Sequence, residues 1–423
     1  MLRILLPLVA LGVLAGCAST PELHLMATPV VYKDVRLDFA STLAPELRST
    51  KASVFYATRR APDVAGKPNH YGDKPDAELR LGIATVALGE PGWTFDELQA
   101  SGLTGSVEHP RSGRVESLEE IGTVRAGRAN TDAERAFVAR INAHLARTKN
   151  PEVAFYVHGY RVAFDEVAVM MGSLSGYLGY GATVAFQWPT GLHFWNYLTD
   201  CPRAEKFIPD ITRVIELLSQ TNAQYVNMLA YSCGSPLLAQ ALARLRGQHP
   251  DEGRAALAKR YRIGNVVFVA SDIDLKTFAR EHVPPIMDLA KQSIVYMSRR
   301  DAALGFSSIV AGASRLGRPD IDDLTVADVE RLAADPRLQG VDVTDVRGAH
   351  EMGGMRGHGY WYANEWIATD VLLSMRYPIP PAQRCLVRAK PGANIWRMPD
   401  NYPDCVAAGL LKAYPQLGSK GTK

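Results

Sequence analysis

A serine at position 232 lies where a strand-like run gives way to a helical pattern. Residues 225–236 read Tyr-Val-Asn-Met-Leu-Ala-Tyr-Ser-Cys-Gly-Ser-Pro, so small residues follow the serine at the turn. A sharp turn of this kind lifts a serine hydroxyl clear of a sheet and directs the next backbone N–H towards a developing oxyanion. The segment therefore predicts nucleophilic catalysis by Ser232, with the N–H of Cys233 as an oxyanion donor. We expect the side chain of Cys233 to be a small packing group.

A serine nucleophile needs a base, because its unperturbed hydroxyl is a poor nucleophile at neutral pH. Among ten histidines, His358 has the most suitable context, in the segment Gly-His-Gly-Tyr at 357–360. This loop follows the last predicted strands and precedes the last predicted helix, so it can fold back over the serine. His350 is the nearby alternative. We expect His358 to be the base.

The imidazole in turn needs a carboxylate that fixes its tautomer and stabilises its charged form. Asp301 follows the strand-like run 293–297 within a few residues, and carboxylates in such places can reach the crevice at the carboxyl edge of a parallel sheet. Asp272 and Asp274 hold a similar position after the preceding run, 265–270. We assign the role to Asp301 and keep Asp272 as the alternative acid.

A second oxyanion donor is expected at the end of an earlier strand, in the segment His158-Gly159-Tyr160. The N–H of Tyr160 is the candidate, and removal of one such donor typically costs ~10²–10³ in rate. We interpret His158 as a brace for this loop and not as a proton carrier. Trp188 and Pro189 end the next strand, where they could line a pocket or pack in the core.

Strand and helix patterns alternate regularly from residue 131 onwards. Such alternation predicts an α/β fold, a mostly parallel sheet with helices on both faces. The predicted strands are 51–60, 81–88, 153–157, 183–187, the run that leads to Ser232, 265–270 and 293–297; the predicted helices begin at 131 and cover 164–178, 204–218, 237–245 and, as the final helix, 364–375.

Six short motifs spread along the chain together resemble those of a bacterial α/β-hydrolase family of unknown function. The resemblance implies an α/β-hydrolase fold and supports Ser232, Asp301 and His358 as a triad, in the chain order Ser, Asp, His of α/β-hydrolases. It spans residues 52–376. The segments that carry it are Val54–Thr58, His158–Tyr160, Trp188-Pro189, Ala230–Gly234, Ser298–Leu304 and Gly357-His358.

The turn around the serine departs from the family pattern at two positions. Ala230 replaces the usual first glycine, and alanine is small enough to let strand and helix approach each other. Tyr231 stands where the family usually has histidine. The residue before the nucleophile need not take part in chemistry, so we keep the assignment of Ser232.

The first 16 residues are typical of a secretory signal. Arg3 precedes an apolar run, residues 4–14, that is too short to span a membrane. The run ends in Leu-Ala-Gly-Cys at 14–17, which resembles the lipobox of bacterial lipoproteins and implies a lipid anchor on Cys17; an ordinary signal peptide with an incidental cysteine is the alternative. Because Ala18 is not aspartate, the resemblance implies outer-membrane attachment in the cell envelope, facing the periplasm.

Four further cysteines are present, at 201, 233, 385 and 405. An oxidising compartment permits disulfides. We predict a bridge between Cys385 and Cys405, while a pairing of Cys201 or free thiols remains open. The predicted organisation is a signal peptide at 1–16, a tether at 17–50, an α/β-hydrolase domain at 51–380 and a C-terminal extension at 381–423 that this bridge would staple.

Composition sets limits on function. The 423 residues are 47% hydrophobic and 22% charged, so the chain can bury a large hydrophobic core. The formal net charge is +3, and nothing indicates nucleic acid as a partner. No metal-ligand spacing or phosphate-binding glycine loop is evident, and we expect no metal or cofactor. The sequence predicts a membrane-anchored serine hydrolase for a small-molecule or lipid ester, with a catalytically silent binding or assembly protein of the same fold as the alternative.

Overall fold

The computed structural model describes residues 23–63, 71–106, 108–125, 131–351, 357–390 and 392–419. Its strands are β1 Leu23–His24, β2 Lys51–Pro62, β3 Tyr71–Leu88, β4 Ser112–Val124, β5 Val153–Val157, β6 Ala182–Gln187, β7 Val226–Tyr231, β8 Ile263–Val269, β9 Ala290–Met297, β10 Leu338–Asp342, β11 Val387–Arg388 and β12 Ile395–Arg397. Its helices are α1 Phe95–Gly102, α2 Asp132–Leu145, α3 Phe164–Tyr177, α4 Tyr197–Arg203, α5 Ile208–Ser219, α6 Gly234–Gly247, α7 Arg254–Tyr261, α8 Leu275–Thr277, α9 Val283–Leu289, α10 Ala302–Ala311, α11 Val326–Ala334, α12 Tyr360–Ala363, α13 Glu365–Arg376 and α14 Tyr402–Ala413.

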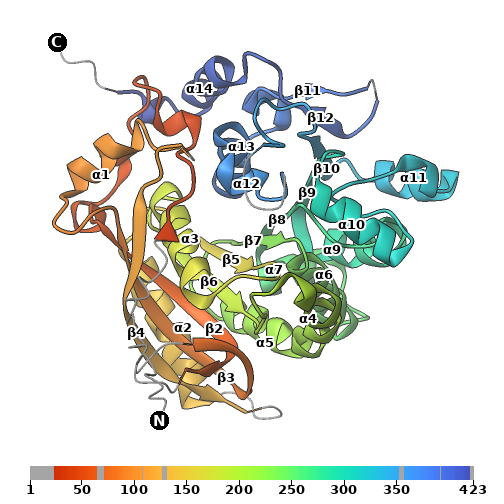
Figure 1. Cartoon of the computed structure of the whole chain (residues 1–423), viewed down its shortest axis with the longest axis horizontal. Coiled ribbons are helices and arrows are strands. Elements are labelled where there is room, and N and C mark those ends of the chain that lie inside the picture. Colours follow the sequence, from red (N-terminus) through yellow and green to blue (C-terminus); the bar gives the residue numbers. More distant parts are fainter. Residues whose placement is uncertain are drawn as a thin grey trace, which may run out of the picture.

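A 12-stranded sheet runs through the molecule in the order β1-β4-β3-β2-β6-β5-β7-β8-β9-β10-β12-β11 (Figure 1). Neighbours are parallel from β2 through β12, and the strands at both edges pair antiparallel. This arrangement confirms the predicted α/β class with a mostly parallel sheet. The parallel centre brings the carboxyl ends of β5, β7, β8 and β9 to one edge, where ligands of such sheets bind.

Helices cover both faces of the sheet because successive strand residues point to opposite sides. Phe155 of β5 packs in a core with α2, α5, α6, α7 and α9, whereas its neighbour Tyr156 packs in a second core with α3, α13 and α14. Both side chains are buried. The sheet therefore has no solvent-facing side at its centre, which explains the continuous apolar runs of these strands.

Local signals in the sequence explain where the helices begin. The Thr131 hydroxyl accepts the N–H of Glu134, and the Glu134 carboxylate accepts the N–H of Thr131, which is a capping box at the start of α2. Glu134 also pairs with Arg213 of α5 at 2.7 Å. One carboxylate thus starts a helix and joins it to its neighbour on the same face.

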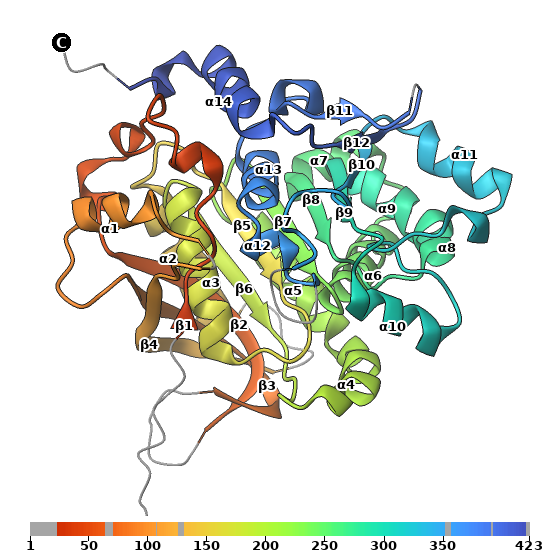
Figure 2. The same cartoon turned by 45° about the horizontal axis from the view of Figure 1, so that its top comes forward.

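The segment 23–50 is not the tether that we predicted. β1 pairs with β4, the side chains of Leu25, Met26 and Val31 are buried, and the segment lies against α3 and α14 (Figure 2). Leu37 forms a β-bridge with Gly418, near the other end of the chain. The prediction was wrong because these apolar residues fill gaps between elements and follow no helical or strand period. Residues 1–16 and Cys17 lie outside the described residues.

The edge strands and the C-terminal region also differ from prediction. β3 is longer than predicted, β4 and β10 were missed, and α13 is followed by α14. The extension 381–423 is joined to the main sheet, because β12 pairs with β10. A disulfide links Cys385 to Cys405. Within the described ranges, no helix combines the length and the apolar character needed to cross a membrane.

Candidate active site

Ser232 occupies a strained turn between β7 and α6. Its φ of 52° lies in the left-handed region, which non-glycine residues adopt rarely and mostly where surrounding structure imposes it. The Ser232 N–H donates to the carbonyl of Val269, and its own carbonyl accepts the N–H groups of Ser235 and Asp272. A Cβ on Gly234 would lie 2.4 Å from the carbonyl oxygen of His158, so only glycine lets α6 approach β5 this closely.

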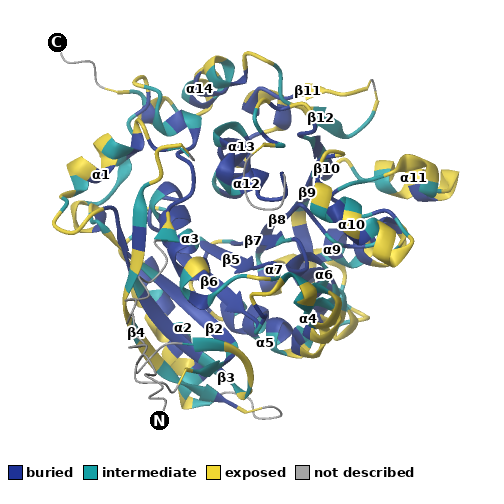
Figure 3. Ribbon diagram, viewed as in Figure 1, coloured by how far each residue is buried: buried dark blue, intermediate teal, exposed yellow. Residues whose placement is uncertain are grey.

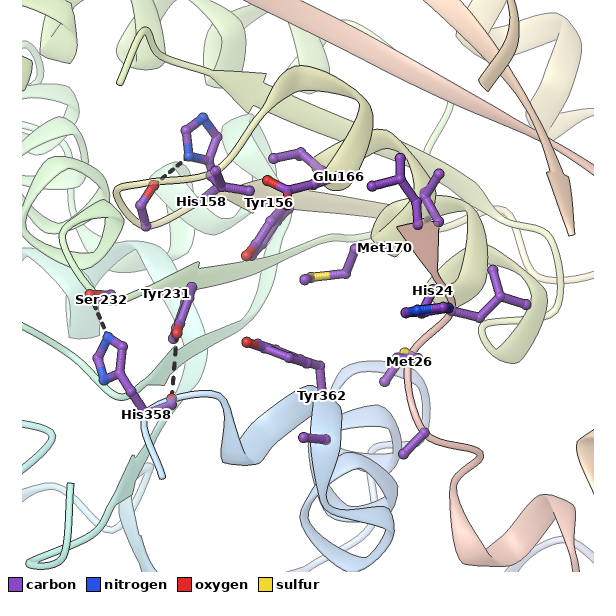
Figure 4. Close-up of a pocket in the computed structure, with 18 of the residues that line it drawn as sticks. His24, Met26, Tyr156, His158, Glu166, Met170, Tyr231, Ser232, His358 and Tyr362 are labelled. Atoms are coloured by element: carbon purple, nitrogen blue, oxygen red, sulfur yellow. Dashed lines mark hydrogen bonds between the residues drawn. The ribbon is translucent and has the colours of Figure 1, made fainter. Parts of the chain in front are cut away.

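The ring of His358 bridges Ser232 and Asp301. Its Nε2 lies 2.8 Å from Ser232 Oγ, and its Nδ1 lies 2.8 Å from Asp301 Oδ2 (Figure 4 shows the contact with Ser232). Because a carboxylate only accepts, Nδ1 carries the proton and Nε2 is free to accept the serine hydroxyl. Asp301 is fully buried, and its other oxygen caps α10 by accepting the N–H of Leu304. The carboxylate is therefore fixed from both sides.

The electrostatics of His358 favour its charged form. Burial lowers the pKa of the imidazole, but the negative charge of Asp301, the hydrogen bond to Asp301 and the charge of Asp272 raise it, and the pKa of His358 lies above its ordinary value. An imidazole with a raised pKa takes a proton more readily, as a general base must.

The alternative candidates for the base and for the carboxylate make contacts of their own. Asp272 accepts the hydroxyl of Tyr197 at 2.8 Å and that of Ser307 at 2.5 Å, and burial, the largest influence, raises its pKa. Asp274 caps α8, and the His350 Nε2 lies 3.4 Å from Glu351. Of the candidates, the structure brings Ser232, His358 and Asp301 into contact and leaves Asp272 near His358 without a hydrogen bond between them.

A braced loop passes over the nucleophile from β5. The Nδ1 of His158 donates to the carbonyl of Gly159 at 2.6 Å, and because the peptide is planar and trans, the N–H of Tyr160 points the opposite way. A Cβ on Gly159 would lie 3.0 Å from the Cβ of Ser232. In the described part of the chain, the N–H groups of Tyr160 and Cys233 donate to no protein acceptor.

Trp188 belongs to the support of this loop and not to a pocket wall. Its indole N–H donates to the carbonyl of His158 at 2.8 Å, and its ring stacks on the His158 imidazole with an interplanar angle of 4°. Burial lowers the pKa of His158 well below its ordinary value, which keeps the ring neutral. The core-packing interpretation of Trp188 therefore applies, and His158 acts as a brace.

A cavity of about 570 Å³ opens beside Ser232. Figure 4 shows Tyr231 nearest to Ser232, Tyr362 and Met170 beyond it, and His24 and Met26 at the far end. The Tyr231 ring also packs on His358, with ring centroids 5.1 Å apart. Most of the lining is apolar, which suits an alkyl or acyl group better than a charged one.

Cys233 forms a disulfide with Cys201 of α4, which corrects the prediction that it is only a packing group. The bond joins the residue after the nucleophile to a segment 32 positions earlier in the chain. α4 also carries Tyr197, which donates to Asp272. The pairing of Cys201 was left open in the sequence, because the place of α4 over the turn follows from tertiary packing.

We expect removal of this disulfide to affect both stability and turnover. The double replacement Cys201→Ala, Cys233→Ala should lower the free energy of unfolding by about 3–4 kcal/mol, from the loop-entropy relation. It should also lower kcat of any reaction at Ser232, because α4 no longer holds Cys233, whose backbone N–H is the candidate oxyanion donor. Denaturant unfolding and ester turnover measure the two effects.

The matched control is Cys385→Ala, Cys405→Ala, which removes a bridge far along the chain from the turn. It should cost about 3 kcal/mol of stability and leave kcat unchanged. Equal loss of kcat in the two double variants would contradict a local role for the Cys201–Cys233 bond.

The model of a family described as "Alpha/beta hydrolase of unknown function (DUF900)" matches residues 133–376. The chain belongs to this family. The match includes Ser232, Asp301 and His358, and the α/β-hydrolase fold explains the turn at the end of β7. No curated protein matches the chain.

Solved structures also contain similar chains. One is a structure of the esterase Est22, which is 12% identical, with 79% of this chain and 82% of that chain covered and a TM-score of 0.27. In the part of this α/β hydrolase that the structure describes, no three His, Cys, Asp or Glu side chains gather in a group that could hold a metal ion.

Several residues at the site were not predicted from sequence. Tyr156, Tyr362 and the segment 23–27 line the cavity, and Ser307 binds Asp272. Only the unusual Tyr231 indicated this cavity in the sequence, because a bulky aromatic side chain next to Ser232 needs room beside the turn. The segment 23–27 gave no such indication, because β1 has only two residues and so shows no alternation of apolar and polar side chains.

Proposed function

We propose that this α/β hydrolase is a serine hydrolase that cleaves a carboxylic ester or a related acyl bond through an acyl-enzyme. The observation that carries the proposal is the position of the His358 ring, which contacts Ser232 Oγ with one nitrogen and Asp301 with the other. This is the geometry that a serine nucleophile needs for activation. The raised pKa of His358 supports the same role.

The proposed reaction has two half-steps. The proton of Ser232 passes to His358 Nε2 while Oγ bonds to the acyl carbon, and the N–H groups of Cys233 and Tyr160 stabilise the oxyanion. The alcohol then leaves with the proton from His358. Water repeats the sequence on the acyl-enzyme and releases the acid. Asp301 keeps the imidazole oriented throughout, and general-base catalysis contributes ~10²–10⁴-fold.

The alternative is a silent binding protein of the same fold. Two observations favour catalysis: the hydroxyl and the imidazole are already 2.8 Å apart, and a cavity reaches Ser232. A binding protein requires neither. The test is a fluorophosphonate probe, which we expect to label the native chain at Ser232, as located by mass spectrometry of the digested protein. Failure to label, with a folded chain, would favour the binding protein.

We also propose that the chain is anchored in the cell envelope by lipid on Cys17, at the outer membrane and facing the periplasm. The two disulfides support an oxidising compartment. The lipobox-like segment at 14–17 supports the anchor. Mass spectrometry of the N-terminal peptide from membranes tests it, since acyl chains on Cys17 add a defined mass and an unmodified cysteine contradicts the anchor.

The cavity predicts a dependence on acyl length. With p-nitrophenyl esters, kcat/KM should rise from acetate to longer chains by about fourfold per added methylene, because each buried methylene contributes ~0.8 kcal/mol. Met170 lines the cavity beyond Tyr231 as seen from Ser232 (Figure 4). Met170→Trp should therefore lower kcat/KM for the longest esters and change acetate little. Equal losses for acetate and long esters would place the acyl group elsewhere.

A further inference from the structure

A cluster of exposed apolar side chains lies on two neighbouring segments: residues 192–203, which include the 3-10 turn Phe194–Asn196 and α4, and α10. We call it the apolar rim; its members are Leu192, Trp195, Leu198, Phe306, Ile309 and Val310. Trp195 is 78% exposed and Ile309 is 82% exposed. α10 contains no charged residue. Figure 3 shows exposed positions over both α4 and α10. Large apolar side chains gathered on a surface mark interaction sites.

The rim borders the proposed catalytic centre. Phe194 packs against Phe306 with ring centroids 5.5 Å apart, which joins the two elements. Both phenylalanines line a small pocket whose other walls include Ser232 and His358. Asp301 caps α10 and contacts His358, so the helix that carries half of the rim begins at the site. A partner on the rim therefore lies beside the small pocket that Ser232 and His358 also line.

The chain length before the described residues indicates which partner this is. Cys17 precedes Leu23 by six positions, and six extended residues span at most about 20 Å. Leu23 lines the large cavity together with Ser232. Acyl chains on Cys17 would thus keep this wall of the cavity within about 20 Å of the bilayer. A membrane is then an apolar surface held at high local concentration close to the cavity that Ser232 also lines.

We infer that the apolar rim docks on the lipid surface and that the enzyme takes its ester substrate from the membrane. The inference rests on the proposed function and on the proposed anchor. Trp195 and Ile309 enter the interfacial region, as tryptophan and aliphatic side chains do in peripheral proteins. The acyl chain passes into the cavity lined by Met26 and Met170. The substrate class is a lipid ester and not a freely dissolved one.

The test separates docking from catalysis by using the chain from residue 17 onwards with Cys17→Ser, which carries neither the apolar signal segment nor acyl chains. This protein should cosediment with vesicles of phosphatidylethanolamine and phosphatidylglycerol. Adding Trp195→Ser and Ile309→Ser should lower the partition coefficient at least about tenfold, because each substitution removes an apolar side chain from the interface. Turnover of a soluble p-nitrophenyl ester should stay unchanged, since neither residue lines a described pocket beside Ser232.

The matched control is Val35→Ser, which removes an 83% exposed apolar side chain from the N-terminal segment. It should retain vesicle binding. Retained binding in the rim variant, or no binding by the Cys17→Ser protein, would overturn the docking proposal. So would a dimer that the rim substitutions dissociate in sedimentation velocity, because a second copy would then cover the rim. The rim substitutions could abolish vesicle binding while even the Cys17→Ser protein with an intact rim hydrolyses no soluble ester. That result would uphold docking and refute the proposed function.

Discussion

Ser232→Ala is expected to lower kcat for a soluble ester by roughly 10⁵- to 10⁶-fold, the scale seen when a triad nucleophile is removed. The oxyanion donors and the cavity remain, so a residual rate of about 10³-fold over water should persist. The fluorophosphonate adduct should disappear, because among the residues that the structure describes no other hydroxyl hydrogen-bonds to the Nε2 of His358. Active-site titration of the native protein measures the fraction of competent sites before the rates are compared.

The control for this variant is Ser235→Ala. Ser235 is buried one helical turn further along, and its hydroxyl donates to the carbonyl of Ala230 and not towards the cavity. We expect a modest loss of stability and nearly native kcat. If Ser232→Ala kept most of the activity, or if Ser235→Ala lost it equally, the nucleophile would be misassigned.

Asp301→Asn should lower kcat about 10⁴-fold, with the fold retained. Asparagine preserves an oxygen that can cap α10 at Leu304, but its amide group either donates towards His358 Nδ1 or no longer stabilises the imidazolium. Nδ1 then loses the acceptor that holds its proton, and Nε2 carries the proton instead. An Nε2 with a proton cannot accept one from Ser232. Circular dichroism and thermal unfolding show whether the fold is intact.

Asp272→Asn is the matched control, and it separates the two candidate acids. Asp272 raises the pKa of His358 through its charge and makes no hydrogen bond to the ring. Neutral imidazole is the active form, so activity rises with pH through the pKa of His358. Removing the charge of Asp272 should lower this pKa and move the acidic limb of kcat/KM to lower pH, with kcat changed less than tenfold. A 10⁴-fold loss in Asp272→Asn, with little in Asp301→Asn, would reverse the assignment.

The strands that position the site were largely predictable from sequence, because they are buried on both faces. Continuous apolar runs predicted β5, β7, β8 and β9, and the residues after them supplied the candidates. The pattern could not distinguish Asp301 from Asp272, because both follow neighbouring parallel strands and so reach the same edge of the sheet. Only the side-chain geometry separates them, one binding His358 and the other Tyr197.

The features that were not predicted depend on tertiary packing, which leaves no periodic pattern of apolar residues in the sequence. β4 is a partly exposed strand near the sheet edge, and Glu116, Glu119 and Glu120 interrupt any alternation of apolar and polar residues in it. β10 has only five residues and contains Gly340, which weakens any strand pattern. The Cys201–Cys233 bond requires α4 to lie over the turn, and the packed segment 23–50 fits grooves between elements distant in sequence.

The contact between residues 37–38 and residues 417–418 has a consequence for biosynthesis. The N–H of Asp38 donates to the carbonyl of Leu417, and Leu37 bridges Gly418, so an early packed segment meets partners that the ribosome makes much later. Residues 23–27, which precede it, form a wall of the cavity. The contacts that hold this wall therefore have a very large sequence separation and form late. The cavity beside Ser232 is therefore complete only after the segment around Leu417 has been synthesised and has packed against residues 37–38.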